Sequence, residues 1–295
     1  MHRAATLTCW GFATAAVSGV FLGIAHRPVA TPAPTAVTLD GVLDANTDDT
    51  PAFTPDGATA FFDRTAGHNK TIMMTRLIHG RWSAAVTAPF SGTWLDQDPA
   101  LAPDGSYLVF SSNRPVHGDS TPVVFVNDSG KSYRGANLWK VARTTDGWGT
   151  PEWLGPAVNT TTLVVAPSVA ADGSVYFIQR YPGAMHIYRS ELRDGKYLPA
   201  ELLPLGNTAL PTHDPAIAPD QSFLIFDYGR TTNGLGRLSI AFRKGQGWSA
   251  PQDLGNAANQ DAPWGAHLGP DHRTVYFTGN THIWRLSLGP WLRAH

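Results

Sequence analysis

Five copies of one short motif divide most of this 295-residue chain into units of similar length. Each copy places a few apolar residues before Pro-Asp-Gly or a close variant, and a strand-like run with an aromatic residue follows. The spacings between consecutive turn aspartates are 48, 68, 48 and 51 residues. Those aspartates are Asp56, Asp104, Asp172, Asp220 and Asp271. Repeats of this length built from short strands are typical of β-propeller blades rather than of helical solenoids.

Each unit is predicted to hold four antiparallel strands. The Asp-Gly pair supplies the tight reversal after the first strand, because glycine accepts backbone angles that other residues avoid. The second strand is predicted to end on a phenylalanine in every copy, at Phe62, Phe110, Phe177, Phe226 and Phe277. Gly-x-Trp turns at Trp82, Trp148 and Trp248 precede the fourth strand. Because these aromatic residues recur at equivalent places, we interpret them as packing between blades rather than as sugar-binding platforms.

The fifth unit stops after its third strand, which would leave an unpaired sheet edge. The segment 37–41 resembles the fourth strands of the other units, since Asn46-Thr47 follows it as Asn159-Thr160 follows Leu154-Gly155. We therefore predict an all-β protein in which residues 37–295 form a single β-propeller of five four-stranded blades. Its N-terminal strand would complete the last blade. A propeller of six blades is the alternative.

The N-terminal segment 1–25 has the features of an export signal. It has a short basic start, an apolar run from Ala4 to Ala25 and small residues near the end of that run. The predicted location is therefore periplasmic or secreted. The apolar run is also long enough to cross a bilayer, so an inner-membrane anchor formed by residues 4–25 is the alternative. Residues 26–36 are rich in proline and alanine and are predicted to form an extended linker.

Charge and cysteine content exclude two classes of function. The formal net charge is -1 at neutral pH, and binding of a nucleic acid needs clustered Lys and Arg residues that this sequence lacks. The single cysteine, Cys9, lies inside the export segment. Disulfides and thiol chemistry are therefore not expected in the mature chain.

The second repeat, from Asp98 to Arg114, resembles the WD40-like (PD40) repeat found in the propeller domain of TolB and in many exported bacterial proteins. The resemblance covers most of residues 37–290. It implies a periplasmic or secreted propeller, which in such proteins is often a platform for binding other proteins. The motif is informative for the fold and carries little information about the ligand.

Charged side chains of opposite sign are predicted to converge on one face of the propeller. The loops that enter the first strands carry Asp49, Asp96, Asp98, His213, Asp214 and Asp261. The loops that join the second and third strands carry Arg64, Arg114, Arg180 and Arg230. Since arginines recur in most repeats, we expect each to pair with an aspartate of its own blade or of a neighbouring blade.

Residues that break the repeat are better candidates for binding. Trp94, Asp96, His213, Trp264 and His267 lie on or beside first strands and lack clear equivalents in other units. The predicted binding residues are Trp94, Asp96, Asp98, His213, Asp214, Asp261, Trp264, His267 and Arg114. The loop histidines His68, His117, His186 and His282 show no metal-ligand spacing, so no metal and no cofactor are predicted.

The longest spacing contains an insertion within residues 115–137, where Val123–Val126 would form an added hairpin over the channel mouth. Loops on a rigid scaffold often carry binding functions. The sequence therefore favours a monomeric, exported, non-catalytic protein that binds a protein or a carbohydrate through this face. No residue is assigned a catalytic role, because the nucleophile elbow, phosphate loop and zinc-protease motifs are absent.

The alternative function is a glycoside hydrolase of the five-bladed arabinanase-like type. Such an enzyme needs a pair of carboxyl groups on either side of the scissile bond. The glutamates Glu152, Glu191 and Glu201 are assigned to outer strands or turns. Catalysis would then depend on channel aspartates, such as Asp98 with Asp214 or Asp261.

Overall fold

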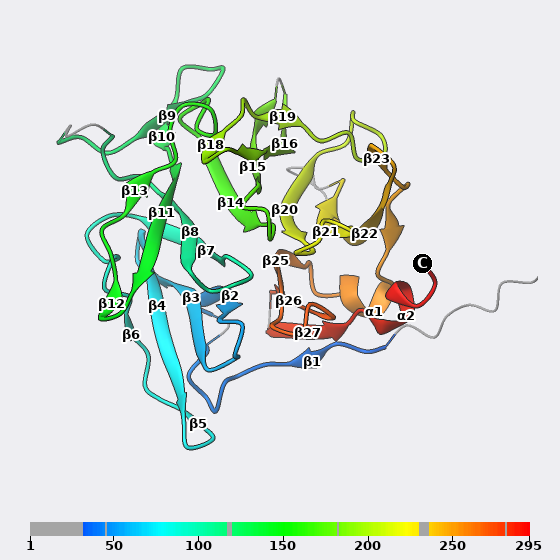
Figure 1. Cartoon of the computed structure of the whole chain (residues 1–295), viewed down its shortest axis with the longest axis horizontal. Helices are drawn as coiled ribbons and strands as arrows, with labels where there is room; N and C mark the ends of the chain where they lie inside the picture. The colour runs from blue at the N-terminus through cyan, green and yellow to red at the C-terminus, as the bar shows by residue number, and fades with distance from the viewer. Residues whose placement is uncertain (1–31, 45, 117–119, 182, 230–235, 281) are drawn as a thin grey trace, which may run out of the picture. The chain divides into compact units, whose positions relative to one another are not determined.

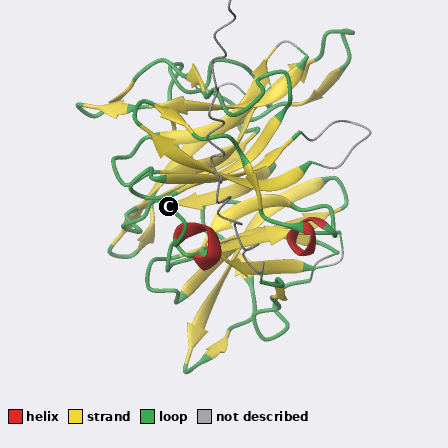
Figure 2. Cartoon of the chain, turned by 90° about the vertical axis from the view of Figure 1, so that its right-hand side faces the viewer, coloured by secondary structure: helices red, strands yellow, loops and turns green. Residues whose placement is uncertain are grey.

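The computed structural model describes residues 32–295 except 45, 117–119, 182, 230–235 and 281. The predicted signal or anchor segment, 1–25, and the linker residues up to position 31 lie outside the described residues. Within the described part, no helix has the length and apolar character needed to span a membrane. The described residues include two four-residue helices, α1 (Asn256–Asn259) and α2 (Gly289–Leu292), and are otherwise built from strands and loops. Figure 2 shows these helices among the strands.

The strands of the described residues form five blades around a common centre, which confirms the prediction of five over six (Figure 1). Each blade has four antiparallel strands in sequence order from the centre outward, apart from the last strand of blade five. Blade one is β2 (Asp48–Phe53), β3 (Thr59–Ala66), β4 (Asn69–Ile78) and β6 (Val86–Thr87). Blade two is β7 (Asp96–Leu101), β8 (Tyr107–Ser112), β11 (Asn137–Thr144) and β13 (Glu152–Trp153). Blade three is β14 (Val164–Val169), β15 (Val175–Tyr181), β16 (Ala184–Ser190) and β19 (Glu201–Leu202). Blade four is β20 (Thr212–Ile217), β21 (Phe223–Tyr228), β22 (Arg237–Lys244) and β24 (Gln252–Asp253).

Blade five combines both ends of the described chain. It contains β25 (Trp264–Leu268), β26 (Thr274–Thr278) and β27 (Ile283–Ser287), and its outer strand is β1 (Thr35–Ala36). Thr35 pairs with Arg285, and the N–H of Val37 donates to the carbonyl of Ile283 at 2.8 Å. The N-terminus therefore completes the last blade, as predicted. The strand begins two residues earlier than the predicted segment 37–41, so the end of the predicted linker belongs to the sheet.

Short extra strands extend several blades. Three of them, β5 (Arg81–Trp82), β12 (Gly147–Trp148) and β23 (Gly247–Trp248), pair with the ends of the third strands. These strands contain Trp82, Trp148 and Trp248, which the sequence pattern assigns to turns. In blade three, β17 (Leu192–Arg193) and β18 (Lys196–Tyr197) form a small hairpin. The insertion forms a separate hairpin of β9 (Val124–Val126) and β10 (Ser132–Arg134).

The apolar core consists of clusters between neighbouring blades. The five recurrent phenylalanines, Phe62, Phe110, Phe177, Phe226 and Phe277, are buried. They do not end their strands, since β3, for example, continues for four residues past Phe62. Trp148 packs against the ring of Phe61 with centroids 5.3 Å apart, which confirms a packing role for this aromatic residue. Burial of these side chains stabilises each blade against the next.

Every first strand in the described residues has a register shift at the same place, where one residue has a positive φ. These residues are Thr50, Asp98, Ala166, Asp214 and Gly265, with φ between 50° and 62°. A bulge of this kind breaks the ladder and redirects a backbone N–H. The N–H of Thr50 donates to Thr278 of blade five, and the N–H of Asp98 donates to Asp63 of blade one. The bulges thus connect each of these blades to the preceding one.

Candidate functional site

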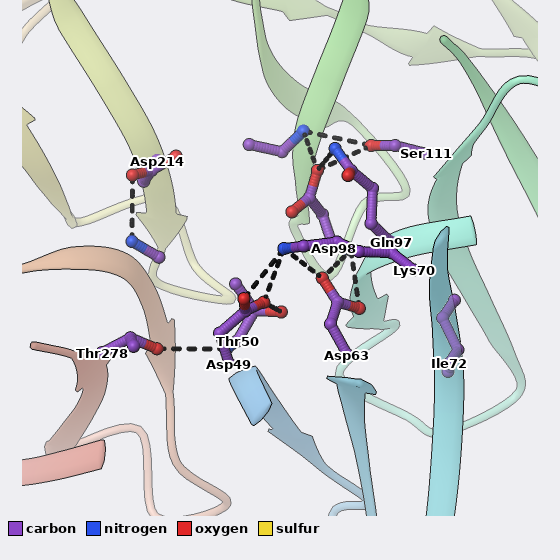
Figure 3. Close-up of polar contacts among 12 residues, drawn as sticks. Asp49, Thr50, Asp63, Lys70, Ile72, Gln97, Asp98, Ser111, Asp214 and Thr278 are labelled. Carbon is purple, nitrogen blue, oxygen red and sulfur yellow. Dashed lines mark hydrogen bonds and ion pairs between the residues drawn. The ribbon is translucent and has the colours of Figure 1, made fainter. Parts of the chain in front are cut away.

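The centre of the ring holds a lysine surrounded by aspartates (Figure 3). Lys70, at the start of β4, points its ammonium group at Asp49, with N···O distances of 2.9 and 2.8 Å. Asp63 Oδ2 lies 3.6 Å from the same nitrogen, and the ring of Trp264 lies 5.6 Å away. The Lys70 side chain is 22% exposed, whereas Asp63 is fully buried. We call Lys70, Asp49, Asp63 and Asp98 the axial cluster.

Burial and mutual repulsion govern the carboxyl groups of the axial cluster. Burial raises the pKa of Asp63 well above its ordinary value, and the charges of Asp49 and Asp98 raise it further against the opposing effect of Lys70. Burial also raises the pKa of Asp98. Burial alone would lower the pKa of Lys70, but the surrounding carboxylates raise it above its ordinary value. The lysine is therefore a permanent cation that offsets negative charge at the centre.

One oxygen of the Asp98 carboxylate is held by three neighbouring donors. Its Oδ2 accepts hydrogen bonds from Ser111 Oγ at 3.0 Å, from Gln97 Nε2 at 3.1 Å and from the N–H of Ala166 at 3.1 Å. The N–H of Asp98 itself donates to both oxygens of Asp63, at 3.1 and 3.0 Å. These contacts join blades one, two and three, so Asp98 has a clear role in holding the ring together.

The other predicted central residues are spread over blades four and five. Asp214 Oδ2 accepts from the N–H of Gly265 at 2.9 Å, and Asp261 Oδ2 accepts from the indole of Trp284 at 2.9 Å. His213 lies in β20 and is half-buried. His267 lines a small cavity of about 60 Å³ beside the Pro-Asp-Gly turns, and removal from water lowers its pKa to about 4 despite the charge of Asp214. This cavity has room for little more than water.

Two of the recurrent arginines pair with aspartates of their own blade. Arg64 pairs with Asp48 at 2.7 Å rather than with Asp49, and Arg114 pairs with Asp96 at 2.8 Å. Arg114 also lies over the rings of Phe110 and Trp139, so Arg114 and Asp96 contribute to blade packing. Arg180 pairs with Asp128 of the insertion. Arg230 lies outside the described residues.

The described histidines and carboxylates do not gather into a metal-binding group of three or more. His186 is buried in β16, and burial lowers its pKa. The ring of His282 lies against Trp284, with centroids 4.9 Å apart. His117 lies outside the described residues. The described loop histidines thus occupy separate environments.

The insertion hairpin is held in place from both sides. The N–H of Val123 donates to the carbonyl of Asn113 at 2.8 Å, and the N–H of Gly135 donates to the carbonyl of Val123 at 3.0 Å. The guanidinium of Arg134 donates to the carbonyl of His68 in blade one. Asp128 forms the ion pair with Arg180 of blade three already described. Figure 1 shows β9 and β10 at the edge of the ring beside blades two and three.

A cleft of about 660 Å³ lies between this hairpin and the loops of blades one and two. We call it the insertion cleft. Its apolar lining is Trp94, Leu95, Pro122, Val123 and Val124. Its other lining residues are Asn69, Thr93, Asn113, Ser132, Tyr133 and Arg134. Clefts of this size are typical of small-molecule and oligomer binding sites.

Only one of the nine predicted binding residues, Trp94, lines the insertion cleft. Of the others, Asp98 belongs to the axial cluster, Asp96 and Arg114 pair within blade two, and the rest lie in blades four and five. Sequence reasoning missed Asn69, Asn113 and Ser132, because amide and hydroxyl side chains in loops carry no pattern of their own. The insertion was the available signal, since it marked the segment that forms one wall of the cleft.

Comparisons with known proteins support the fold. The sequence matches no family model and no curated protein. Among solved structures, a putative TolB from Agrobacterium tumefaciens aligns with a TM-score of 0.51 and 17% identity, over 80% of this chain and 71% of that one. A gluconolactonase from Xanthomonas campestris aligns with a TM-score of 0.51 and 12% identity, over 87% and 95% of the two chains.

A third structure, TolB from Acinetobacter baumannii, aligns with a TM-score of 0.46 and 18% identity, over 70% of this chain and 43% of that one. The chain thus spans less than half the length of that TolB. The likeness to the Agrobacterium protein confirms that the chain has the TolB-like propeller fold. At these identities the comparisons describe the architecture, and the site itself must indicate the function.

Proposed function

We propose that this chain is an exported, non-catalytic binding protein that takes a protein or carbohydrate ligand in the insertion cleft. The observation that carries the proposal is the cleft of about 660 Å³ between the insertion hairpin and Trp94. Its walls rest on a rigid ring, because the hairpin is tied to blades one and three by Arg134 and Asp128. A preformed cleft on a rigid scaffold costs little ordering entropy when a ligand binds.

The state of the central aspartates supports binding rather than glycoside hydrolysis. A hydrolase needs a general acid and a second carboxylate that face the substrate. Here Asp98, Asp214 and Asp261 accept hydrogen bonds from backbone or side-chain donors of the ring. Glu152 and Glu201 are exposed on the outer strands β13 and β19. Asp98 and Asp214 are thus better explained as connections between blades, and Asp261 as a contact within blade five.

A matched pair of exposed valines tests the cleft. Val124 in the cleft is 48% exposed and Val86 on β6 is 54% exposed, and both lie on short strands. We expect Trp94→Ala and Val124→Ser to abolish or strongly weaken capture of the ligand identified by a pull-down and a glycan array, whereas Val86→Ser retains it. Equal capture by all variants would contradict the proposal. Release of reducing sugar by the wild type, lost in a folded Asp98→Asn variant, would instead establish catalysis.

Export is part of the proposal and rests on the apolar segment 1–25. Cell fractionation of the full chain, followed by sequencing of the mature N-terminus, tests it. Recovery from the periplasm or medium with a new N-terminus near residue 26 supports a cleaved signal. Recovery in the membrane fraction with the segment intact supports the anchor, and recovery in the cytoplasm would contradict export.

A further inference from the structure

The lining of the insertion cleft is nearly uncharged. Among the lining residues that the structure describes, the one charged side chain is Arg134, whose guanidinium donates to the carbonyl of His68. Asp96, which follows the lining residue Leu95 in sequence, pairs with Arg114. A ligand with phosphate or several carboxylate groups would meet no cluster of cations here, and a basic peptide would meet no cluster of carboxylates. The chemistry of the cleft therefore matches a neutral ligand.

Hydrogen-bonding groups in the cleft remain available to a ligand. Asn69, Thr93 and Ser132 are exposed and make no side-chain hydrogen bond within the described part of the chain. Asn113 accepts from the N–H of Leu95 at 2.9 Å through Oδ1, which leaves its two amide N–H donors for the cleft. Amides and hydroxyls both donate and accept, and a ligand rich in hydroxyl groups satisfies such groups in pairs.

Trp94 supplies an apolar surface beside these polar groups. Its ring is half-buried, and among the described residues it has no ring, cation or hydrogen-bond partner. By contrast, Trp148 packs on Phe61 and Phe90, and Trp284 donates to Asp261. An indole combines a flat apolar face with one N–H donor. The C–H face of a pyranose ring packs on such a surface while its hydroxyl groups reach the amides at the edge.

The form of the cleft favours an oligomer over a flat protein surface. It is bounded by the hairpin on one side and by the loops around Asn69 and Trp94 on the other. Gly135 fixes the base of the hairpin, since a Cβ there would lie 2.8 Å from the side chain of Val123 and would overlap the carbonyl of Thr162. A concave, open and preformed cleft is typical of sites that bury most of a small ligand.

From these four observations we infer that the insertion cleft binds an uncharged oligosaccharide, with one sugar ring on Trp94. The inference rests on the proposed function and names the class of ligand for that site. Asn69 and Asn113 bind the hydroxyl groups, and Val123 and Val124 contact the apolar edges. Because the ligand is neutral, its affinity should change little with salt concentration.

Isothermal titration of the full chain with short oligomers of glucose, xylose and N-acetylglucosamine tests the inference, with Trp fluorescence as a second readout. We expect at least one oligomer to bind. Trp94→Ala should weaken binding at least about tenfold, as loss of a central aromatic contact does, whereas Trp94→Phe should retain most of it. Asn113→Asp keeps the acceptor for Leu95 and removes the donors, so it should also weaken binding. Val86→Ser is the control and should bind as the wild type does.

The other outcomes separate this inference from the proposed function. If none of the oligomers binds and a protein partner is captured through Trp94, the oligosaccharide is wrong and the cleft remains a binding site. If a uronic acid oligomer binds more tightly than the neutral oligomers and its affinity falls with salt, the ligand is a charged oligosaccharide. The assignment of the cleft as an oligosaccharide site would then stand. Binding of an oligomer that is unaffected by Trp94→Ala and Asn113→Asp would overturn both proposals for the cleft.

Discussion

The axial cluster and the insertion cleft are joined by two consecutive residues, Lys70 and Asn69, yet they use polar side chains in different ways. Lys70 contacts Asp49 and Asp63, and Asp98 accepts three hydrogen bonds from blades two and three. Asn69, one residue earlier, lines the cleft and makes no side-chain hydrogen bond in the described chain. Polar groups at the centre thus hold the ring together, while polar groups of the insertion cleft remain available to a ligand.

The difference follows from burial. A buried charge without a partner costs several kcal/mol, so central residues must be paired for the ring to form. Loop residues on the rim stay hydrated and need no partner within the chain. Mutations in the axial cluster should therefore lower the stability of the protein, whereas mutations in the insertion cleft should weaken ligand binding and leave stability nearly unchanged.

The largest expected effect is at Lys70. In Lys70→Met the carboxyl groups of Asp49, Asp63 and Asp98 lose the cation that they surround, so the free energy of unfolding should fall by about 3–5 kcal/mol. Urea denaturation at neutral pH measures this. Lys131→Met removes an exposed lysine that lies over Tyr133 and should change the value by about 0.5 kcal/mol or less. Equal stability of the two variants would show that the axis does not depend on its cation.

The pH dependence of stability should distinguish Asp63→Asn from the wild type. The folded-state pKa of Asp63 is raised, so the folded state holds a proton that the unfolded chain releases near its ordinary value of about 4. Its contribution is complete below that value and is lost as pH rises toward the folded-state pKa, at up to about 1.4 kcal/mol per pH unit. Asparagine at this position does not titrate, and its amide oxygen can still accept the hydrogen bond from the N–H of Asp98.

Urea midpoints over a pH series from acidic to neutral test this prediction. The wild type should lose stability with rising pH more steeply than Asp63→Asn. A smaller slope should remain in the variant, because burial also raises the pKa of Asp98. Parallel curves for the two proteins would mean that Asp63 is ionised in the folded state.

A moderate effect is expected where the insertion joins the ring. In Gly135→Ala the new Cβ overlaps the carbonyl of Thr162 and lies 2.8 Å from Val123, so stability should fall by about 1–3 kcal/mol and the cleft should change shape. Gly149→Ala is the matched control, since its Cβ would have no atom closer than 3.5 Å. Thermal unfolding and ligand titration of both variants measure the two consequences. Full binding by Gly135→Ala would show that the hairpin adapts.

The smallest effect on stability is expected at Trp94. Trp94→Ala removes a half-buried ring that has no ring, cation or hydrogen-bond partner among the described residues, so the free energy of unfolding should change much less than at a core tryptophan, by about 1 kcal/mol or less. Trp139→Ala, in the cluster between blades one and two, should cost about 3–5 kcal/mol. Denaturation of both variants gives the comparison. A large loss for Trp94→Ala would make Trp94 part of the core rather than of the cleft.

The sequence predicted the features that repeat. Five copies of one turn gave five blades, and the missing fourth strand in the last unit indicated closure by the N-terminus. In two copies glycine is replaced at the turn, by Gln221 and His272, yet these residues adopt the same positive φ of 59° and 51°. Repetition allowed the pattern to be recognised where the local residue alone would not have indicated a turn.

The bulges and the charge pairing could not be predicted in the same way. Asp98 and Asp214 precede prolines, and residues before proline usually favour extended backbone rather than a positive φ. Because successive side chains of a strand point to opposite faces, Arg64 reaches Asp48 while Lys70 reaches Asp49. Lys70 occurs in one blade alone, so no repetition in the sequence marked it as the central cation.

The pairing of β1 with β27 also sets the timing of folding. The outer strand of blade five is the first described strand to be synthesised, and its partner follows the other four blades. Contacts between segments so far apart in sequence form slowly, because a long loop must close before they contribute. A nascent chain can assemble separate sheets as they emerge, but β1 can pair with β27 and close the ring only after β27 has been synthesised. Until then β1 has no partner strand, and its unpaired edge is open to pairing with other strands.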